Sequence, residues 1–159
     1  MPELIGDADG AGLRICVVVA RWNSFVTQKL LDGAVSELRK RGLDEAAITV
    51  VWVPGAFEVP TAAKWAAEVG AFDAVICLGA VIRGETAHFE YVAGGAAEGI
   101  LRVSQDTGVP VIFGVLTVDS VEQAMARCGG KDGHKGEEAA QAAIEMTNLR
   151  RLLRETSSG

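Results

Sequence analysis

The segment from Gly79 to His88 combines glycines with residues that can bind an anion and transfer a proton. It reads GAVIRGETAH and runs from an apolar stretch into a predicted helix, a junction that presents backbone N–H groups to phosphate. The spacing of Gly79, Gly84 and Thr86 is similar to that of a nucleotide-binding phosphate loop, but Glu85 stands where that loop requires Lys. This excludes nucleotide hydrolysis and leaves two interpretations, a small phosphate held at Glu85 and Thr86 or a plain tight turn.

Histidine and arginine residues supply candidate proton-transfer and charge-neutralising groups. His88 follows the predicted anion site, and an unperturbed imidazole titrates at about pH 6.5, which suits proton transfer. An isolated histidine is usually a surface residue, but this position favours a functional interpretation. His134, in the glycine-rich connection 129–136, keeps the surface interpretation. Arg127 is near the end of a predicted helix, where it could simply complement the helix dipole.

Three aromatic side chains could sandwich a flat heterocycle. Trp22 follows the first predicted strand, Phe57 lies with Glu58 in the proline-bounded loop 54–60, and Phe113 lies in a later strand. The prolines restrict the backbone of the loop and suit it to orienting a ligand. Taken singly, Phe113 is typical of a core residue.

The elements that must position these residues alternate along the chain. Apolar, β-branched runs predict strands at 13–20, 48–53, 74–80 and 111–118, and helical spacing predicts helices beginning at 23 or 24 and ending before Gly42, and near 61–69, 88–105 and 137–154. A capping box at Ser120 begins one more helix. This alternation predicts an α/β fold with a parallel sheet between helical layers. Ligands are then expected on the loops 20–24, 54–60, 79–88 and 116–120, which follow the strands.

Composition excludes several classes of function. The 159 residues fit one domain, and a net charge of -6 without a Lys/Arg run excludes a nucleic-acid partner. The 3 Cys lack metal-ligand spacing, so we expect reduced thiols and no metal. Residues 1–12 lack the pattern of a signal peptide, and no apolar run approaches the ~18 residues that span a bilayer, so we expect a cytoplasmic protein without membrane contact. Hydrophobic residues at 49%, counted with 19 Gly, exceed the usual share and suggest buried subunit contacts.

Five blocks taken together resemble the lumazine synthase family in order, spacing and position on loops. They are RWN at 21–23, PGAFEVP at 54–60, GAVIRGETAHFEY at 79–91, GVPVIFGV at 108–115 and EQAMAR at 122–127. The resemblance covers about residues 13–153. It implies a flavodoxin-like three-layer αβα sandwich with a central parallel four-stranded sheet. Trp22 stands where many relatives have Phe and Ala80 where some have Thr, and neither change removes a stacking face or a charge.

The resemblance also implies a reaction and a set of site residues. Family members condense 5-amino-6-(D-ribitylamino)uracil with 3,4-dihydroxy-2-butanone 4-phosphate to 6,7-dimethyl-8-ribityllumazine, phosphate and water, without metal or organic cofactor, in the penultimate step of riboflavin biosynthesis. His88 would transfer protons, and the butanone phosphate would be bound by Glu85, Thr86 and Arg127. Residues implied for ribitylaminouracil are Trp22, Ala56, Phe57, Glu58, Ala80, Val81, Ile82, Phe113 and Lys135, with Phe113 supplied by a neighbouring subunit.

The sequence also leads to expectations about subunit assembly and about the limits of the domain. The resemblance implies a homopentamer, and the glycine-rich segment is similar to that of members that form icosahedral shells of sixty subunits; riboflavin synthase is a possible partner. We expect a flexible N-terminal segment at 1–12, the lumazine synthase domain at 13–154 and a disordered tail at 155–159. Two rival functions are a flavin-binding electron-transfer module, because the fold suits flavin mononucleotide, and a structural shell subunit whose catalysis is vestigial.

Overall fold

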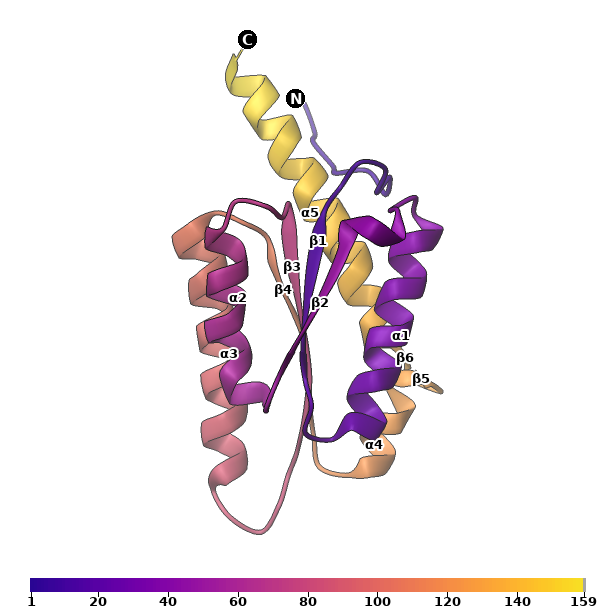
Figure 1. Cartoon of the computed structure of the whole chain (residues 1–159), viewed down its shortest axis with the longest axis vertical. Helices are drawn as coiled ribbons and strands as arrows, with labels where there is room; N and C mark the ends of the chain where they lie inside the picture. The colour runs from indigo at the N-terminus through magenta and orange to yellow at the C-terminus, as the bar shows by residue number, and fades with distance from the viewer. Residues whose placement is uncertain (159) are drawn as a thin grey trace.

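A parallel sheet of four strands forms the centre of the computed structural model, which describes residues 1–158 (Figure 1). The strand order is β2-β1-β3-β4, and each neighbouring pair is parallel. The strands are β1 (Ile15–Ala20), β2 (Ile48–Val53), β3 (Ala74–Ile82) and β4 (Val111–Val118). The predicted α/β class and the central four-stranded parallel sheet are confirmed.

Helices cover both faces of this sheet and make the three layers of the predicted sandwich (Figure 1). One face carries α1 (Ser24–Lys40), α4 (Val121–Ala126) and α5 (Lys135–Ser158). The other carries α2 (Val59–Glu68) and α3 (His88–Thr107). Short 3-10 helices, η1 (Glu45–Ala47) and η2 (Ala56–Glu58), flank β2, and a small antiparallel hairpin of β5 (Cys128–Gly130) and β6 (Gly133–His134) joins α4 to α5.

Alternation along the central strands divides the core in two. In β1, Ile15, Val17 and Val19 belong to the cluster under α1 and α5, whereas Cys16 and Val18 belong to the cluster under α2 and α3. Every residue of β1 is buried, as expected of a β-branched strand with helices on both faces. The sheet thereby holds the carboxyl ends of β1 and β3 in fixed positions next to each other.

The N-terminal segment contacts the last helix, α5. The side-chain amide of Asn148 on α5 donates to the backbone oxygens of Asp7 (3.0 Å) and Asp9 (2.9 Å), and Gly6 is buried. Helix α5 begins two residues earlier than expected and continues to Ser158. Residue 159, the end of the tail expected at 155–159, lies outside the described residues.

The three cysteines are buried and not disulfide-bonded. Burial raises the pKa of the Cys16 thiol to about 11, and it raises the pKa of Cys77 and Cys128 as well. None of the helices in residues 1–158 combines the length and the apolar composition needed to cross a membrane.

Candidate active site

A cavity of about 220 Å³, the strand-end pocket, opens beyond the carboxyl ends of β1 and β3. Seven predicted site residues line it, drawn from the loop after β1, from η2, from the end of β3 and from the β3–α3 loop. They are Trp22, Ala56, Ala80, Val81, Ile82, Thr86 and His88. The pocket lies where parallel-sheet topology predicts a ligand site.

Trp22 is fixed on one side and exposed on the other. Its backbone N–H donates to the Pro54 oxygen (3.0 Å), and Arg21 N–H donates to the Val53 oxygen (2.8 Å), so the loop after β1 is bound to the end of β2. The indole lies against Gly55, where an added Cβ would be only 2.3 Å from the ring atom Cε3. The side chain is still 63% exposed, which leaves a planar surface available for stacking.

Asn23 lines the same pocket, and sequence reasoning placed it only as a possible helix cap. Its φ of 64° puts it in the left-handed region, which Asn tolerates better than most residues. Its Nδ2 donates to the Ala80 backbone oxygen at 2.8 Å and thereby joins the loop after β1 to β3. An Asn in the short loop between a buried strand and a helix was the available signal.

The β3–α3 loop brings the predicted anion-binding and proton-transfer residues together. Helix α3 begins at His88, and the His88 N–H donates to Thr86 Oγ1 at 3.3 Å, which leaves the threonine hydroxyl hydrogen available to an anion. His88 is exposed, so its imidazole is accessible to a ligand. The predicted position of His88 in the first turn of a helix is confirmed.

Arg83 secures this loop to two other elements. Its guanidinium donates to Asp119 Oδ1 (2.9 Å), forms an ion pair with Glu90 on α3 and lies 4.2 Å from the centroid of the Phe89 ring. The hydrogen bonds to Asp119 and Glu90 raise the pKa of Arg83, and the same contact with Arg83 lowers the pKa of Glu90. Sequence reasoning did not select Arg83 as a site residue, although it lies inside the glycine-rich motif.

Arg127, Lys135 and Phe113 line a separate cavity of about 330 Å³ beside β4, here named the β4–α5 hollow. The Arg127 guanidinium donates to the Gln123 oxygen (3.0 Å) and lies 3.5 Å from Asp132 Oδ2. Within the described chain, the residues that line this hollow differ from those that line the strand-end pocket. One copy therefore presents the predicted site in two parts.

Comparison with known proteins identifies the family. Residues 12–151 match the family model described as 6,7-dimethyl-8-ribityllumazine synthase. The chain belongs to this family. The resemblance to lumazine synthases is thereby confirmed, and it makes the chain a transferase of riboflavin biosynthesis. The matched range contains both the strand-end pocket and the β4–α5 hollow.

Three residues expected from the lumazine synthase resemblance lie near the strand-end pocket but outside its lining. Phe57 is 60% exposed, and its Cε2 would lie 3.0 Å from a Cβ added at Gly95 on α3. Glu85 is exposed in the β3–α3 loop. Glu58 is half-buried, and its Oε2 is buried without a hydrogen-bond partner in residues 1–158. Buried carboxylate oxygens are normally hydrogen-bonded, so Glu58 is suited to accept a bond from a bound ligand.

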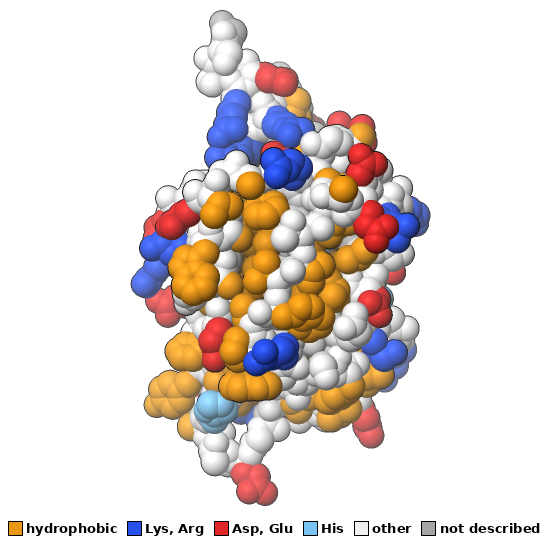
Figure 2. All heavy atoms as spheres, viewed as in Figure 1, with side chains coloured by type: hydrophobic (Ala, Val, Ile, Leu, Met, Phe, Trp, Pro, Cys, Tyr) orange, Lys and Arg blue, Asp and Glu red, His pale blue; other side chains and the backbone are white. Residues whose placement is uncertain are grey.

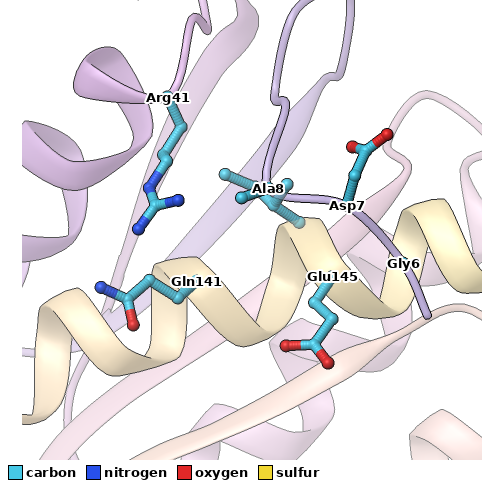
Figure 3. Close-up of a pocket in the computed structure, with 7 residues that line it drawn as sticks. Gly6, Asp7, Ala8, Arg41, Gln141 and Glu145 are labelled. Atoms are coloured by element: carbon cyan, nitrogen blue, oxygen red, sulfur yellow. The ribbon is translucent and has the colours of Figure 1, made fainter.

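Another cavity, of about 160 Å³, lies between the N-terminal segment, the end of α1 and α5 (Figure 3). Arg41 and Gln141 point into it, and each donates to the buried carboxylate of Glu37, at 2.8 and 3.1 Å. The residues of the described chain that line it exclude every residue expected from the lumazine synthase resemblance. Its network fastens α1 to α5.

Proposed function

We propose that the chain condenses 5-amino-6-(D-ribitylamino)uracil with 3,4-dihydroxy-2-butanone 4-phosphate to form 6,7-dimethyl-8-ribityllumazine, phosphate and water. The observation that carries the proposal is the convergence of Trp22, Thr86 and His88 on one pocket in a chain of this family. A stacking surface, an anion site and a proton-transfer group are the three functions that the condensation needs at one place.

The uracil ring stacks on the exposed side of Trp22. The nearby end of β3, Ala80 to Ile82, provides apolar lining for the ring, and Ala56 lines the same pocket. The ribityl chain carries hydroxyl donors, and the unpaired Oε2 of Glu58 supplies an acceptor of the matching kind. Phe57 lies close by and covers the ligand from the exposed side.

The phosphate of the butanone binds at the β3–α3 loop, where Glu85 and Thr86 offer backbone N–H groups and Thr86 a hydroxyl. Arg127 neutralises it, and Lys135, expected on the ribitylaminouracil side of the site, lines the same hollow as Arg127. Because these two cations line a different cavity of the same copy, they reach the substrates from a neighbouring copy, together with Phe113. The active site is thus completed at a contact between two subunits.

Exposed apolar side chains support such contacts. Figure 2 shows hydrophobic side chains gathered over the face crossed by β2. The exposed large hydrophobic residues include Val50 and Trp52 on β2 and Trp65 on α2. Contiguous apolar patches of this kind are typical of subunit interfaces. Copies of the chain form a homopentamer, which can assemble further into a sixty-subunit shell, in the cytoplasm; riboflavin synthase is the partner expected for such a shell.

The reaction begins with attack of the uracil amine on the ketone carbonyl. Loss of phosphate, ring closure and dehydration follow, and His88 carries protons between these steps. Holding the two substrates together contributes about 7–11 kcal/mol, whereas a general acid or base contributes about 10²–10⁴-fold, or roughly 3–5.5 kcal/mol. Positioning is therefore the larger contribution.

The test supplies both substrates to the purified native assembly and follows product fluorescence and phosphate release in parallel, with the native mass measured on the same sample. Equal rates of lumazine and phosphate formation are expected. Phosphate release without lumazine, or the absence of both from an assembled sample, would refute the proposed reaction.

A further inference from the structure

The imidazole of His134 is enclosed by three glycines. An added Cβ would lie 2.1 Å from its Cε1 at Gly33 on α1, 3.0 Å from Cε1 at Gly136 on α5 and 3.4 Å from Cδ2 at Gly129 on β5. The first distance is far below any van der Waals contact, so a side chain at position 33 would displace the ring. The half-buried His134 is therefore held in one orientation by packing rather than lying free on the surface.

This orientation directs Nδ1 at the first turn of α5. Nδ1 accepts the backbone N–H of Gly136 at 3.1 Å and that of Glu137 at 3.4 Å. The first N–H groups of a helix lack intrahelical acceptors, so His134 caps the N-terminus of the longest helix described. A nitrogen that accepts hydrogen bonds must be unprotonated, and the helix dipole opposes a positive charge at this end. Only the neutral imidazole can cap α5.

The cap is connected to both cations of the β4–α5 hollow. His134 pairs with Cys128 in the β5–β6 hairpin, and the backbone N–H of Lys135, the next residue, donates to the Arg127 oxygen at 2.8 Å. Arg127 and Lys135 thus flank the hairpin whose far strand carries the cap. A change in the first turn of α5 moves Lys135 directly and Arg127 through this backbone hydrogen bond.

Titratable and charged groups occur on every element packed against the imidazole. On α1 they are Lys29, whose ammonium partly offsets the rise that burial causes in the pKa of Cys128, and Asp32, which accepts a hydrogen bond from Gln28 at 2.9 Å. The hairpin and α5 contribute Cys128, Asp132, Lys135 and Glu137. The variants His134→Ala, Gly33→Ala and His134→Asn all retain these groups, so their charges are the same in every protein compared.

We propose that His134 is a positioning residue for the phosphate side of the site, whose neutral form caps α5 and holds Arg127 and Lys135, and whose protonation weakens phosphate binding. The proposal rests on the proposed function for the identity of the anion. Phosphate binding should therefore weaken as the pH falls because His134, which lies outside the β4–α5 hollow, becomes protonated.

Three variants of the full-length assembly test the cap. His134→Ala removes the cap, and Gly33→Ala displaces the imidazole ring. His134→Asn replaces the imidazole with an amide, whose oxygen accepts hydrogen bonds but does not titrate. Hydrogen–deuterium exchange of the peptide that covers the first turn of α5 should accelerate by roughly 2- to 30-fold in the two alanine variants, the factor equivalent to a lost cap. His134→Asn should match the wild type near pH 8.

Titration with inorganic phosphate tests the positioning role. Wild type and His134→Asn should bind phosphate equally at about pH 8. At about pH 5.5 the wild type should bind phosphate several-fold more weakly than His134→Asn does. The ionisation of phosphate itself cancels in this comparison, because both proteins bind the same anion. Parallel pH profiles for the two proteins, or unchanged exchange in His134→Ala, would overturn the proposal. Failure of every variant to bind phosphate would overturn the proposed anion site and this role with it, while the exchange data would separately decide the cap.

Discussion

Replacing Arg127 with alanine separates the two ligands of the proposed reaction. In one copy, the guanidinium donates to the Gln123 oxygen (3.0 Å) and lies 3.5 Å from Asp132 Oδ2. Both members of this ion pair are more than 40% exposed, and exposed pairs contribute about 0–1 kcal/mol. The substitution should therefore lower the free energy of unfolding by no more than about 1 kcal/mol.

The effect on phosphate binding should be larger. A hydrogen bond between charged partners contributes about 1.5–3 kcal/mol, which corresponds to a roughly 10- to 160-fold weaker affinity. Only the phosphorylated ketone should lose this affinity, because the proposed site for ribitylaminouracil is the strand-end pocket of the neighbouring copy.

Separate titration of each ligand measures both effects. Arg39→Ala is a matched control, since it removes a similar exposed ion pair, to Glu45 at 3.7 Å, and Arg39 lines neither the strand-end pocket nor the β4–α5 hollow. Arg127→Lys should recover part of the phosphate affinity because it restores the charge without the bidentate geometry. Equal losses for both ligands, or an undiminished affinity for the phosphorylated ketone, would refute the assignment of Arg127.

Three further predictions concern proton transfer, acid stability and the thiols. His88→Ala should reduce kcat by about 10²–10⁴-fold while leaving measurable turnover and an unchanged melting temperature, and complete inactivity of a correctly assembled variant would count against positioning as the main contribution. The hydrogen bond from Arg41 lowers the pKa of Glu37, so this carboxylate stabilises the fold above the ordinary pKa of 4.5 and the contribution is lost as pH falls through the lower folded-state value. Urea unfolding at a series of acid pH values should show a smaller loss of stability in Glu37→Gln than in the wild type, and equal slopes would contradict this. Burial raises the pKa of Cys16 to about 11 and also raises that of Cys77, so a thiol reagent should label them only after unfolding; rapid labelling of both in the native protein would be inconsistent with their burial.

Much of the strand-end pocket could be predicted because parallel-sheet topology places the carboxyl ends of neighbouring strands together. The β-branched run of β1 and the apolar run of β3 identified the two central strands. Trp22 lies in the short loop after β1, and His88 begins the helix after β3, so their approach followed from the strand assignments alone.

Contacts between residues that are far apart in the sequence were harder to predict. The sequence could not reveal that Asn23 donates to the Ala80 oxygen, since that contact spans 57 positions. It could not place Arg127 in a separate hollow either, because that depends on α4 covering the face of the sheet opposite α3. His134 was interpreted as a surface residue since nothing local in a glycine-rich segment indicates that Gly33 on another helix receives its ring.

The central claim, that each site combines the strand-end pocket of one copy with the β4–α5 hollow of another, is tested most directly by mixing two impaired variants. His88→Ala and Arg127→Ala subunits would be dissociated, combined in equal amounts and reassembled. A site between an Arg127→Ala copy, which keeps His88, and a His88→Ala copy, which keeps Arg127, is intact, so random assembly should restore about a quarter of wild-type activity. Activity no higher than the mean of the separate variants would show that both residues act within one copy and would contradict the account.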